Sequence, residues 1–537
     1  MIYRFMPRTS HLRTFDRAAA RLSRRDLLRL FGAAGVAGFA LPMSTSRLFA
    51  QPIFRSYPFT LGVASGDPTA DGVVLWTRLA PKPLEGGGMP MANVEVGWEI
   101  ADDQTFRAIV QRGNTVARPE LGHSVHVELS GLRPGRDYFY RFMAGAEVSQ
   151  VGRTKTAPPV GGPVDQLRYA VCGCSQYEVG YFTAFRHLAN ESFDFVFHTG
   201  DYIYEYRANG GQDPLRVRQH HGDEIYTLVD YRTRYAQYKM DPDLMAAHHS
   251  APFVVTLDDH ETDNNYAGDT DEHGTPPEIF LLRRAAAYQA YYESMPVRAA
   301  SMPNGPHMRL YRRLQFGNLI DLSVLDTRQW RTDQACGDGN HTHCAAADDP
   351  RRTILGAEQE QWLFKTLGTS TATWTVLGQQ VPTFARDQKA ILPDGQFSMD
   401  KWDGYTVSRK RLYARLQEAK TPNPIVLSGD VHLHFGADLK ADYRDPKSAT
   451  VGVELTNTSI TSGGDGGEYQ AGWDQIKPDN PHIKFHSGRR GYIACTATSK
   501  TMRADFKTVE RVTTPGEPLK VPGSLVVEAG RSGANVA

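Results

Sequence analysis

Asp201 and Tyr204 stand three residues apart directly after a run of apolar residues, in the stretch FDFVFHTGDYIYE at 193–205. A Phe- and Val-rich run that ends in Thr-Gly is typical of a central strand that stops at a turn, so we expect Asp201 just beyond a strand end. A carboxylate and a phenol are oxygen ligands suited to a hard cation. The alternative is that Asp201 caps a turn or a helix and that the tyrosines are ordinary half-buried residues.

Five further apolar runs end in residues of ligand type. The expected strands and their tails are LRYAVCG with Cys174, PFVVTLDDHE with Asp258, Asp259 and His260, NLIDLSVLDTR with Asp326 and Arg328, WTVLGQQVP with Gln379 and Gln380, and PIVLSGDVH with Asp430 and His432. Ligands of α/β sheets bind beyond the carboxyl ends of strands, so these tails predict one shared site. Because six strand ends carry residues of ligand type, Asp201 is better explained as a metal ligand than as the cap of a turn or helix.

The residue types at these tails indicate metal-assisted chemistry. Phenolate and thiolate need a strong Lewis acid to form at neutral pH, and ferric iron is the common metal ion best suited to a phenolate ligand. Further carboxylates with few histidines favour Ca²⁺, Mg²⁺ or Mn²⁺ as the partner ion over a second zinc. Adjacent metals neutralise a bound anion and activate water, and Arg284 or Arg328 would clamp the oxygens of that anion. The combination suits hydrolysis of a phosphate ester.

The elements that position these residues are strands that alternate with helical patterns, which predict a layered α/β domain over residues 163–511. Residues 55–157 instead contain short strands and turns without a helical period, which predicts an N-terminal β-sandwich domain. There, LRPGRDYFY resembles the fibronectin type III signature, with Tyr138 as the candidate tyrosine corner. Residues 512–537 are expected to form a C-terminal tail. Helices are expected at 181–190, 278–295, 357–367 and 408–419.

Residues 1–50 have the pattern of an export signal. They hold nine arginines and two acids, and SRRDLL at 23–28 precedes a short apolar run at 30–41. The paired arginines resemble a twin-arginine signal peptide, and the apolar run is too short to span a membrane. We therefore expect the twin-arginine translocation machinery as a partner and a periplasmic or secreted location. An amphipathic N-terminal helix is the alternative.

Composition narrows the class of protein. Lys+Arg and Asp+Glu both number 60, which argues against nucleic acid as the main partner, and no other stretch is long and apolar enough to make an integral membrane protein. Residues 51–537 carry 51 basic and 58 acidic groups, a net charge of about −7. Of the five cysteines, Cys336 and Cys344 bracket the polar loop GDGNHTH and are the natural disulfide pair. We expect a monomer.

Several motifs carry a family resemblance: GCSQ, HTGDYIYEY, LDDHETDNN, RRAAAYQAYYE, LDTRQWR, ILGAEQEQWL, WDGY and LSGDVH. Together, over residues 59–511, they resemble the alkaline phosphatase D (PhoD-like) family of metallophosphoesterases. The resemblance implies a calcineurin-like fold, an α/β layered metallophosphoesterase with β-sheets flanked by helices, preceded by a fibronectin/Ig-like β-sandwich. It also implies hydrolysis of phosphate mono- and diesters with Fe³⁺ and Ca²⁺, with Mn²⁺ or Mg²⁺ as alternatives to Ca²⁺.

The resemblance also assigns roles by position. Cys174, Asp201, Tyr204 and His432 would hold iron, with Asp201 as the bridge to a second metal. Asp259, Asp430 and Asn265 would serve calcium or the substrate phosphate.

The catalytic roles carried over by the resemblance have simpler alternatives. LDDHE resembles the Asn-His-Glu motif of wider metallophosphoesterases, so His260 would help to protonate the leaving group, or would only orient a ligand. Arg284 would clamp the phosphate, or would be a solvated basic residue. His434 stands where the family usually has serine.

Two functions of different class follow. The first is an exported phosphoesterase. The second is a non-catalytic cell-surface or matrix-binding protein built on the same scaffold. A scaffold has no reason to keep Cys, Tyr, Asp and His at coincident strand ends, so the residues favour the enzyme.

Overall fold

The computed structural model describes residues 54–211, 215–342, 344–389, 395–445 and 447–537. The expected signal peptide at 1–50 lies outside these residues. Across the described ranges, none of the helices combines the length and the apolar character needed to cross a bilayer.

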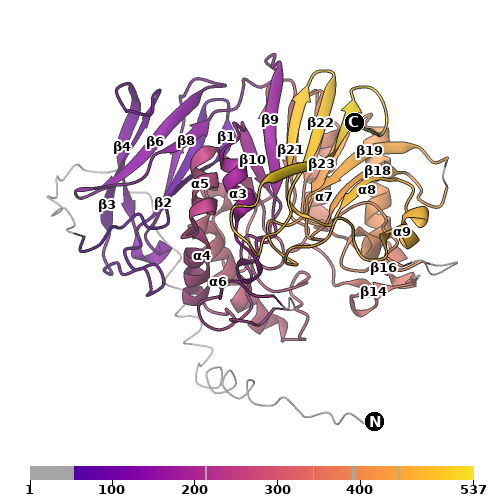
Figure 1. Ribbon diagram of the computed structural model, residues 1–537, viewed down its shortest axis with the longest axis horizontal. Coiled ribbons are helices and arrows are strands. Elements are labelled where there is room, and N and C mark those ends of the chain that lie inside the picture. The colour runs from indigo at the N-terminus through magenta and orange to yellow at the C-terminus, as the bar shows by residue number, and fades with distance from the viewer. Residues whose placement is uncertain (1–53, 212–214, 343, 390–394, 446) are drawn as a thin grey trace, which may run out of the picture. The chain divides into compact units, whose positions relative to one another are not determined.

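A ten-stranded mixed sheet forms one half of the core (Figure 1). Its central strands β9, β10, β11 and β1 are parallel, and the antiparallel strands β21 and β2 lie beside β9 and β1, respectively. Their carboxyl ends therefore meet at one edge of the sheet. In spatial order the strands are β24 (Ala534–Val536), β23 (Leu519–Glu528), β22 (Thr501–Val509), β21 (Arg490–Thr498), β9 (Gln166–Cys172), β10 (Phe195–His198), β11 (Phe253–Val255), β1 (Val63–Thr69), β2 (Gly72–Arg78) and β5 (Ser124–Leu129).

A seven-stranded sheet forms the other half. Its strands β13, β15, β17 and β19 are parallel. The strand order is β12 (Arg312–Phe316), β13 (Ile320–Val324), β15 (Trp374–Gly378), β17 (Pro424–Ser428), β19 (Thr450–Thr456), β18 (His434–Lys440) and β20 (Ile483–Ser487). A two-stranded ribbon of β14 (Asn340–His341) and β16 (Phe397–Ser398) lies apart from it.

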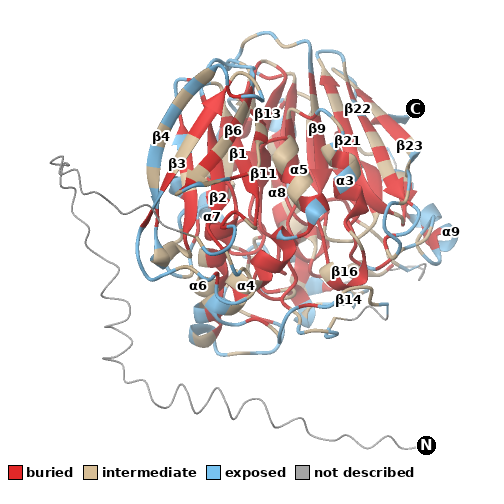
Figure 2. Cartoon of the chain, turned by 60° about the vertical axis from the view of Figure 1, so that its left-hand side comes forward, coloured by how far each residue is buried: buried red, intermediate tan, exposed pale blue. Residues whose placement is uncertain are grey.

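The two large sheets pack face to face through one apolar core. Phe195 of β10 stacks on Phe316 of β12 with ring centroids 4.3 Å apart. A Cβ atom at Gly378 of β15 would lie 2.5 Å from the ring of Phe197, so a larger residue would displace this ring in the core between the sheets. Figure 2 shows the central strands as the most buried part of the chain.

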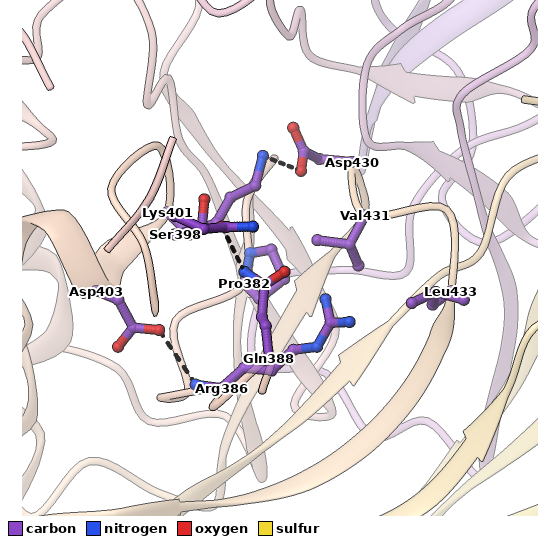
Figure 3. A pocket seen from close by; sticks show the side chains of 10 residues that line it. Pro382, Arg386, Gln388, Ser398, Lys401, Asp403, Asp430, Val431 and Leu433 are labelled. Atoms are coloured by element: carbon purple, nitrogen blue, oxygen red, sulfur yellow. Dashed lines mark hydrogen bonds and ion pairs between the residues drawn. The ribbon is translucent and has the colours of Figure 1, made fainter. Parts of the chain in front are cut away.

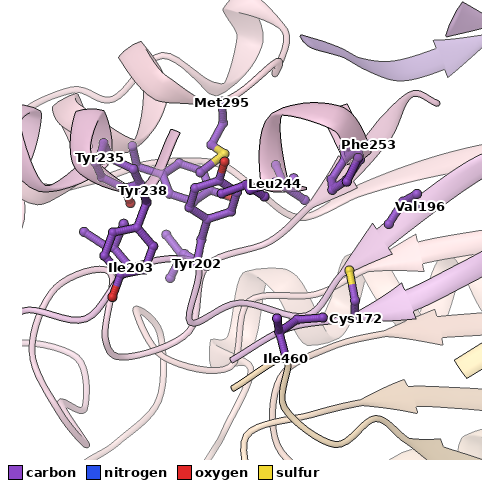
Figure 4. Close-up of a cluster of buried hydrophobic side chains, with 14 of the residues drawn as sticks. Cys172, Val196, Tyr202, Ile203, Tyr235, Tyr238, Leu244, Phe253, Met295 and Ile460 are labelled. Carbon is purple, nitrogen blue, oxygen red and sulfur yellow. The ribbon is translucent and has the colours of Figure 1, made fainter. Parts of the chain in front are cut away.

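Helices cover the outer face of each sheet. Helices α3 to α6 and the strands β9, β10 and β11 share a second core rich in tyrosine, part of which Figure 4 shows. Helices α7 and α8 pack on the seven-stranded sheet in a third core. The layers therefore run helix, sheet, sheet, helix. The helices are α3 (Thr183–Ala189), α4 (Leu228–Lys239), α5 (Pro242–Ser250), α6 (Pro277–Ser294), α7 (Gly356–Leu367), α8 (Thr406–Glu418) and the single turn α9 (Trp473–Ile476).

The six expected strands and four expected helices are present, but α4 and α5 were not expected. The α4 sequence looks polar because tyrosines form its buried face and because it contains the buried Arg234. The Arg234 side chain is tolerated there because it donates to backbone carbonyls such as that of Tyr206, 2.9 Å away. Its start is signalled by a capping box between Thr227 and Asp230, which sequence reasoning overlooked.

The strands of the expected N-terminal β-sandwich share a sheet with the rest of the chain. The second sheet of the sandwich is β4 (Ile109–Ala117), β3 (Val94–Ala101), β6 (Asp137–Ala144) and β7 (Glu147–Val148), with β8 (Gly152–Lys155) paired to β6. This sheet packs on β1, β2 and β5 in one core. However, β1 also pairs with β11 in parallel at Gly66 and Phe253, so the first sheet of the sandwich continues into the ten-stranded sheet.

Two smaller predictions agree with the structure. The buried Tyr138 hydroxyl accepts a hydrogen bond from the Arg133 backbone amide at 2.9 Å, which is the contact of a tyrosine corner. Cys336 and Cys344 form a disulfide.

The expected C-terminal tail is instead part of the core. Within residues 512–537, β23 and β24 extend the ten-stranded sheet beyond β22. Leu525 and Val527 of β23 are buried in the core between the sheets. The terminal position of these residues suggested a tail, whereas buried and half-buried residues alternate over the last four residues of β23, as in a strand.

Leu525→Ala should therefore destabilise the protein by about 2–5 kcal/mol, because the side chain is fully buried. The measurement is urea unfolding followed by circular dichroism. The matched control is Val521→Ala on the same strand, 51% exposed, which should change stability by no more than about 0.5 kcal/mol. Equal effects of the two substitutions would contradict the role of β23 in the core.

Candidate metal centre

The four side chains expected to hold iron meet where the segments after β9, β10 and β17 converge. Cys174, Asp201 and His432 each offer one ligand atom within 4.8 Å of the others. The Tyr204 hydroxyl donates to Asp201 Oδ2 at 2.9 Å and lies 3.2 Å from His432 Nε2. A thiol, a carboxylate, a phenol and an imidazole thus surround one point, and they come from both large sheets.

The ligand residues share an unusual backbone conformation. Cys174, Asp201, Asp430 and His432 have φ angles of 57°, 54°, 67° and 56°. Non-glycine residues adopt this left-handed region only where the surrounding structure holds them there. The concentration of such residues at the strand tails is typical of a functional site.

A glycine precedes the ligand residue in three of these tails, because the tails approach one another closely. A Cβ atom at Gly173 or at Gly429 would lie 2.2 or 2.4 Å from Thr199 Oγ1. Gly200 has a φ of 110°, and its Cβ atom would lie 2.6 Å from the Asp258 backbone nitrogen. Side chains at these glycines would push the strand tails apart.

Two further groups of potential ligands overlap with the first. Asp201, Asp259 and His260 offer ligand atoms within 4.8 Å of one another, and so do Asp258, Asp259 and Asp430. Asp201 belongs to two groups and Asp259 to two, so the three groups form a continuous chain. The arrangement has room for adjacent cations that share carboxylates.

Asn265 is tied to this chain through its backbone. Its amide donates to Asp259 Oδ2 at 2.7 Å, and its φ of 52° is left-handed. Its side-chain Nδ2 donates to Asp338 Oδ2 at 2.8 Å. Asp338 lies within the loop closed by the Cys336–Cys344 disulfide. The disulfide-bonded loop therefore helps to position Asn265.

The fully buried guanidinium of Arg328 neutralises the acidic side of the site. It pairs with Asp258 at 2.5 Å, with Asp400 and Asp430 at 2.9 Å, and with Asp259 at 3.5 Å. A buried charge surrounded by carboxylates stabilises those carboxylates. Its donors are used for this purpose, which does not fit the expected role of Arg328 as an anion clamp.

Arg284 is not brought to the cluster. It is buried on α6, where Nε donates to the Pro306 carbonyl at 2.9 Å and Nη1 donates to the Gly268 carbonyl. Its donors thus hold two loops together, which fits neither a phosphate clamp nor the solvated alternative.

Two expected strand tails also stay outside the three groups. The Gln380 side chain accepts a hydrogen bond from the Thr327 backbone amide and donates one to the Thr256 hydroxyl. The Gln379 side chain donates a hydrogen bond to the Val381 carbonyl and accepts one from the Trp402 indole. Asp326 accepts from the backbone amide of Arg328 at 3.0 Å. These polar residues stabilise the turns.

The donor set fits strongly charged cations. Burial raises the pKa values of the Cys174 thiol and the Tyr204 phenol well above their ordinary ranges, and the charge of Asp201 raises both further. Asp201 Oδ1 and Asp258 Oδ2 are buried and find no hydrogen-bond partner within the described residues. Buried carboxylate oxygens without partners are costly unless they bind an ion.

His260 and Glu205 form a buried pair beside Tyr204. His260 Nδ1 lies 2.7 Å from Glu205 Oε2, and the His260 ring stacks on that of Tyr204 at 4.0 Å. Burial opposes the charged ring, but Glu205, Asp259 and Asp201 together raise the pKa of His260. Nδ1 is thus occupied, whereas Nε2 makes no hydrogen bond within the described residues.

Sequence reasoning missed three supporting residues. The buried carboxylate of Glu261 accepts from the backbone amides of Asp201, Tyr202 and Asp258, which joins the tails of β10 and β11. Glu205 orients His260. Ser462 donates to the Tyr204 hydroxyl at 2.7 Å. Glu261 ends the LDDHE motif, which was a visible signal, whereas Ser462 is distant in sequence and gave none.

His434 supports the site from behind rather than joining it. Its Nδ1 accepts from the Thr458 backbone amide at 3.2 Å, and the Thr458 hydroxyl donates to the His432 carbonyl at 3.1 Å. Burial lowers the pKa of His434 to about 3, so the ring is neutral.

Comparisons with known proteins agree with this site. Residues 169–506 match the family described as PhoD-like phosphatase, and residues 44–158 match its N-terminal domain. The chain is 50% identical over 509 residues to alkaline phosphatase D of Bacillus subtilis (strain 168), covering 94% of this chain and 87% of that protein. A solved structure of PhoD, 50% identical, superposes with a TM-score of 0.88 over 90% of this chain and 93% of the other. The chain therefore belongs to the PhoD-like phosphatase family.

Proposed function

We propose that this chain is an exported hydrolase of phosphate mono- and diesters. The observation that carries the proposal is the convergence of Cys174, Asp201, Tyr204 and His432 beside a chain of carboxylates that shares Asp201. Family membership supports the reaction class. The arginine-rich sequence of residues 1–50 supports export through the twin-arginine machinery.

We further propose the cofactors as Fe³⁺ and Ca²⁺. Iron would be held by Cys174, Asp201, Tyr204 and His432, since thiolate and phenolate ligands favour a strong Lewis acid. Asp259 and Asp430, with Asp258, offer the oxygens that Ca²⁺ prefers, and Mn²⁺ or Mg²⁺ are alternatives. Bound metals would supply neutralisation of the phosphate charge and activation of water.

Around the metals, the protein's own groups have separate tasks. Arg328 favours the ionised carboxylates, because its charge lowers the pKa values of Asp258 and Asp259, whereas burial is the larger effect and raises both. His260, held by Glu205, is placed to donate a proton to the departing alkoxide. Asn265 is tethered to Asp259 and would orient the phosphate beside it.

For the fold, we propose a calcineurin-like layout of the two large sheets and a fibronectin/Ig-like β-sandwich for the N-terminal strands. The helix–sheet–sheet–helix layering and the tyrosine corner at Tyr138 support both.

The proposed phosphoesterase function predicts that protein supplied with iron and calcium releases p-nitrophenol from p-nitrophenyl phosphate and from its bis-ester. Metal analysis of protein folded and exported by its own host should find iron and calcium. Absence of turnover of both esters under these conditions would overturn the proposed function in favour of a non-catalytic binding protein.

A proton-donating role for His260 predicts a dependence on the leaving group. His260→Asn should lower kcat for an alkyl phosphate by about 10²- to 10³-fold, because the alkoxide cannot leave unprotonated. Turnover of p-nitrophenyl phosphate should fall far less, since p-nitrophenolate leaves as an anion. Glu205→Gln is the companion variant and should show the same trend more weakly. An equal loss on both substrates would mean that His260 only orients its neighbours.

A phenolate ligand predicts colour. Iron-loaded protein should show a visible charge-transfer band that Tyr204→Phe removes, because the hydroxyl that lies beside Asp201 and His432 is then missing. Tyr206→Phe, two residues away in the same loop, is the matched control and should keep the band. A band that survives Tyr204→Phe would show that another group binds the iron.

A further inference from the structure

A cavity of about 310 Å³ opens beside the metal centre. Asp430 belongs both to the wall of this cavity and to the carboxylate chain of the site. The other walls come from β14, β16 and the segments after β15 and β17, including Ser398, Gln388 and Leu433 (Figure 3). A phosphate held at the metal centre would therefore direct its organic group into this space.

Arg386 lines the cavity with donors that the protein does not use. Its guanidinium extends toward Val431 in Figure 3 and packs over the ring of Phe435 at 4.9 Å. Nη2 donates to Gln470 Oε1 at 2.5 Å, but Nε is buried and has no partner within the described residues. Nη1 likewise makes no hydrogen bond there.

Two carboxylates, those of Asp403 and Asp430, interact electrostatically with Arg386, but other cations neutralise both of them. Asp403 pairs with Arg409 at 2.5 Å and accepts only the backbone amide of Arg386. Asp430 pairs with Arg328 and with Lys401. Across the described part of the chain, no carboxylate lies within 4.0 Å of the Arg386 guanidinium. Burial lowers the pKa of Arg386 to about 10, so it stays a cation near neutral pH.

We propose that this cavity binds the organic group of the substrate and that Arg386 recognises a second oxyanion on it. A guanidinium with donors that the protein leaves unused forms charge-assisted hydrogen bonds with phosphate or carboxylate oxygens. The preferred substrates are then phosphate esters whose alcohol carries another phosphate or a carboxylate. This inference rests on the proposed phosphoesterase function and adds a substrate class to it.

Three alkyl phosphates of similar length test the inference: hydroxypropyl phosphate, carboxyethyl phosphate and propanediol bisphosphate. The readout is kcat/KM for each anionic probe relative to hydroxypropyl phosphate, so that a general loss of activity cancels. The wild-type protein should prefer at least one anionic probe, and which one distinguishes phosphate from carboxylate. Arg386→Gln should lower this ratio about 10- to 100-fold, mainly through KM. Arg386→Lys should restore part of it.

Further variants guard against misfolding of Arg386→Gln. Gln388→Glu, which places a negative charge in the same cavity, should lower the ratio, and Gln388→Lys should raise it. Arg351→Gln, whose side chain is 88% exposed, should leave the ratio unchanged.

Two failures are distinguishable. If hydroxypropyl phosphate is hydrolysed but the ratio shows no anionic preference, or if the preference survives Arg386→Gln, the inference is overturned while the phosphoesterase stands. If no probe is hydrolysed, the proposed function fails. Calorimetric titration with propanediol bisphosphate then tests binding to the cavity independently of catalysis. Binding that Arg386→Gln weakens supports the subsite. Equal binding by the two proteins, or no binding, overturns it.

Discussion

The site depends on a steric constraint at the ends of three strands. The tails of β9, β10 and β17 each turn at a glycine and then place a ligand residue in the left-handed region. Gly173 and Gly429 both lie against the hydroxyl of Thr199, where no side chain would fit. Because β9 and β10 belong to one sheet and β17 to the other, this crowding holds the two sheets in register at their carboxyl edges.

The second constraint is charge. The tails bring Asp201, Asp258, Asp259 and Asp430 into a space where burial disfavours their ionised forms. Arg328 offsets part of that charge from the protein side. The oxygens that remain without partners, together with a thiol and a phenol of raised pKa, make a site suited to binding cations. Its chemistry and its stability therefore depend on the same groups.

The periphery of the fold serves this centre. The Cys336–Cys344 loop reaches Asn265 through Asp338 and contributes Asn340 to the cavity beside Asp430. The N-terminal strands continue into the large sheet, since β1 pairs with β11, the strand that ends before Asp258. A change in these outer parts can therefore reach the site through backbone hydrogen bonds.

The sequence by itself determined six central strands of the two large sheets, the residue types at their ends and the disulfide pair. These are local signals: an apolar run, a glycine turn and a polar residue after it remain visible wherever the chain folds. Only the tertiary structure decided what depends on distant contacts. It brought the strand tails together from two sheets, paired Arg328 with four carboxylates, turned Arg284 toward backbone carbonyls and drew the expected tail into the core as β23. No local pattern encodes these outcomes, because each is set by which partner lies opposite once the layers have packed.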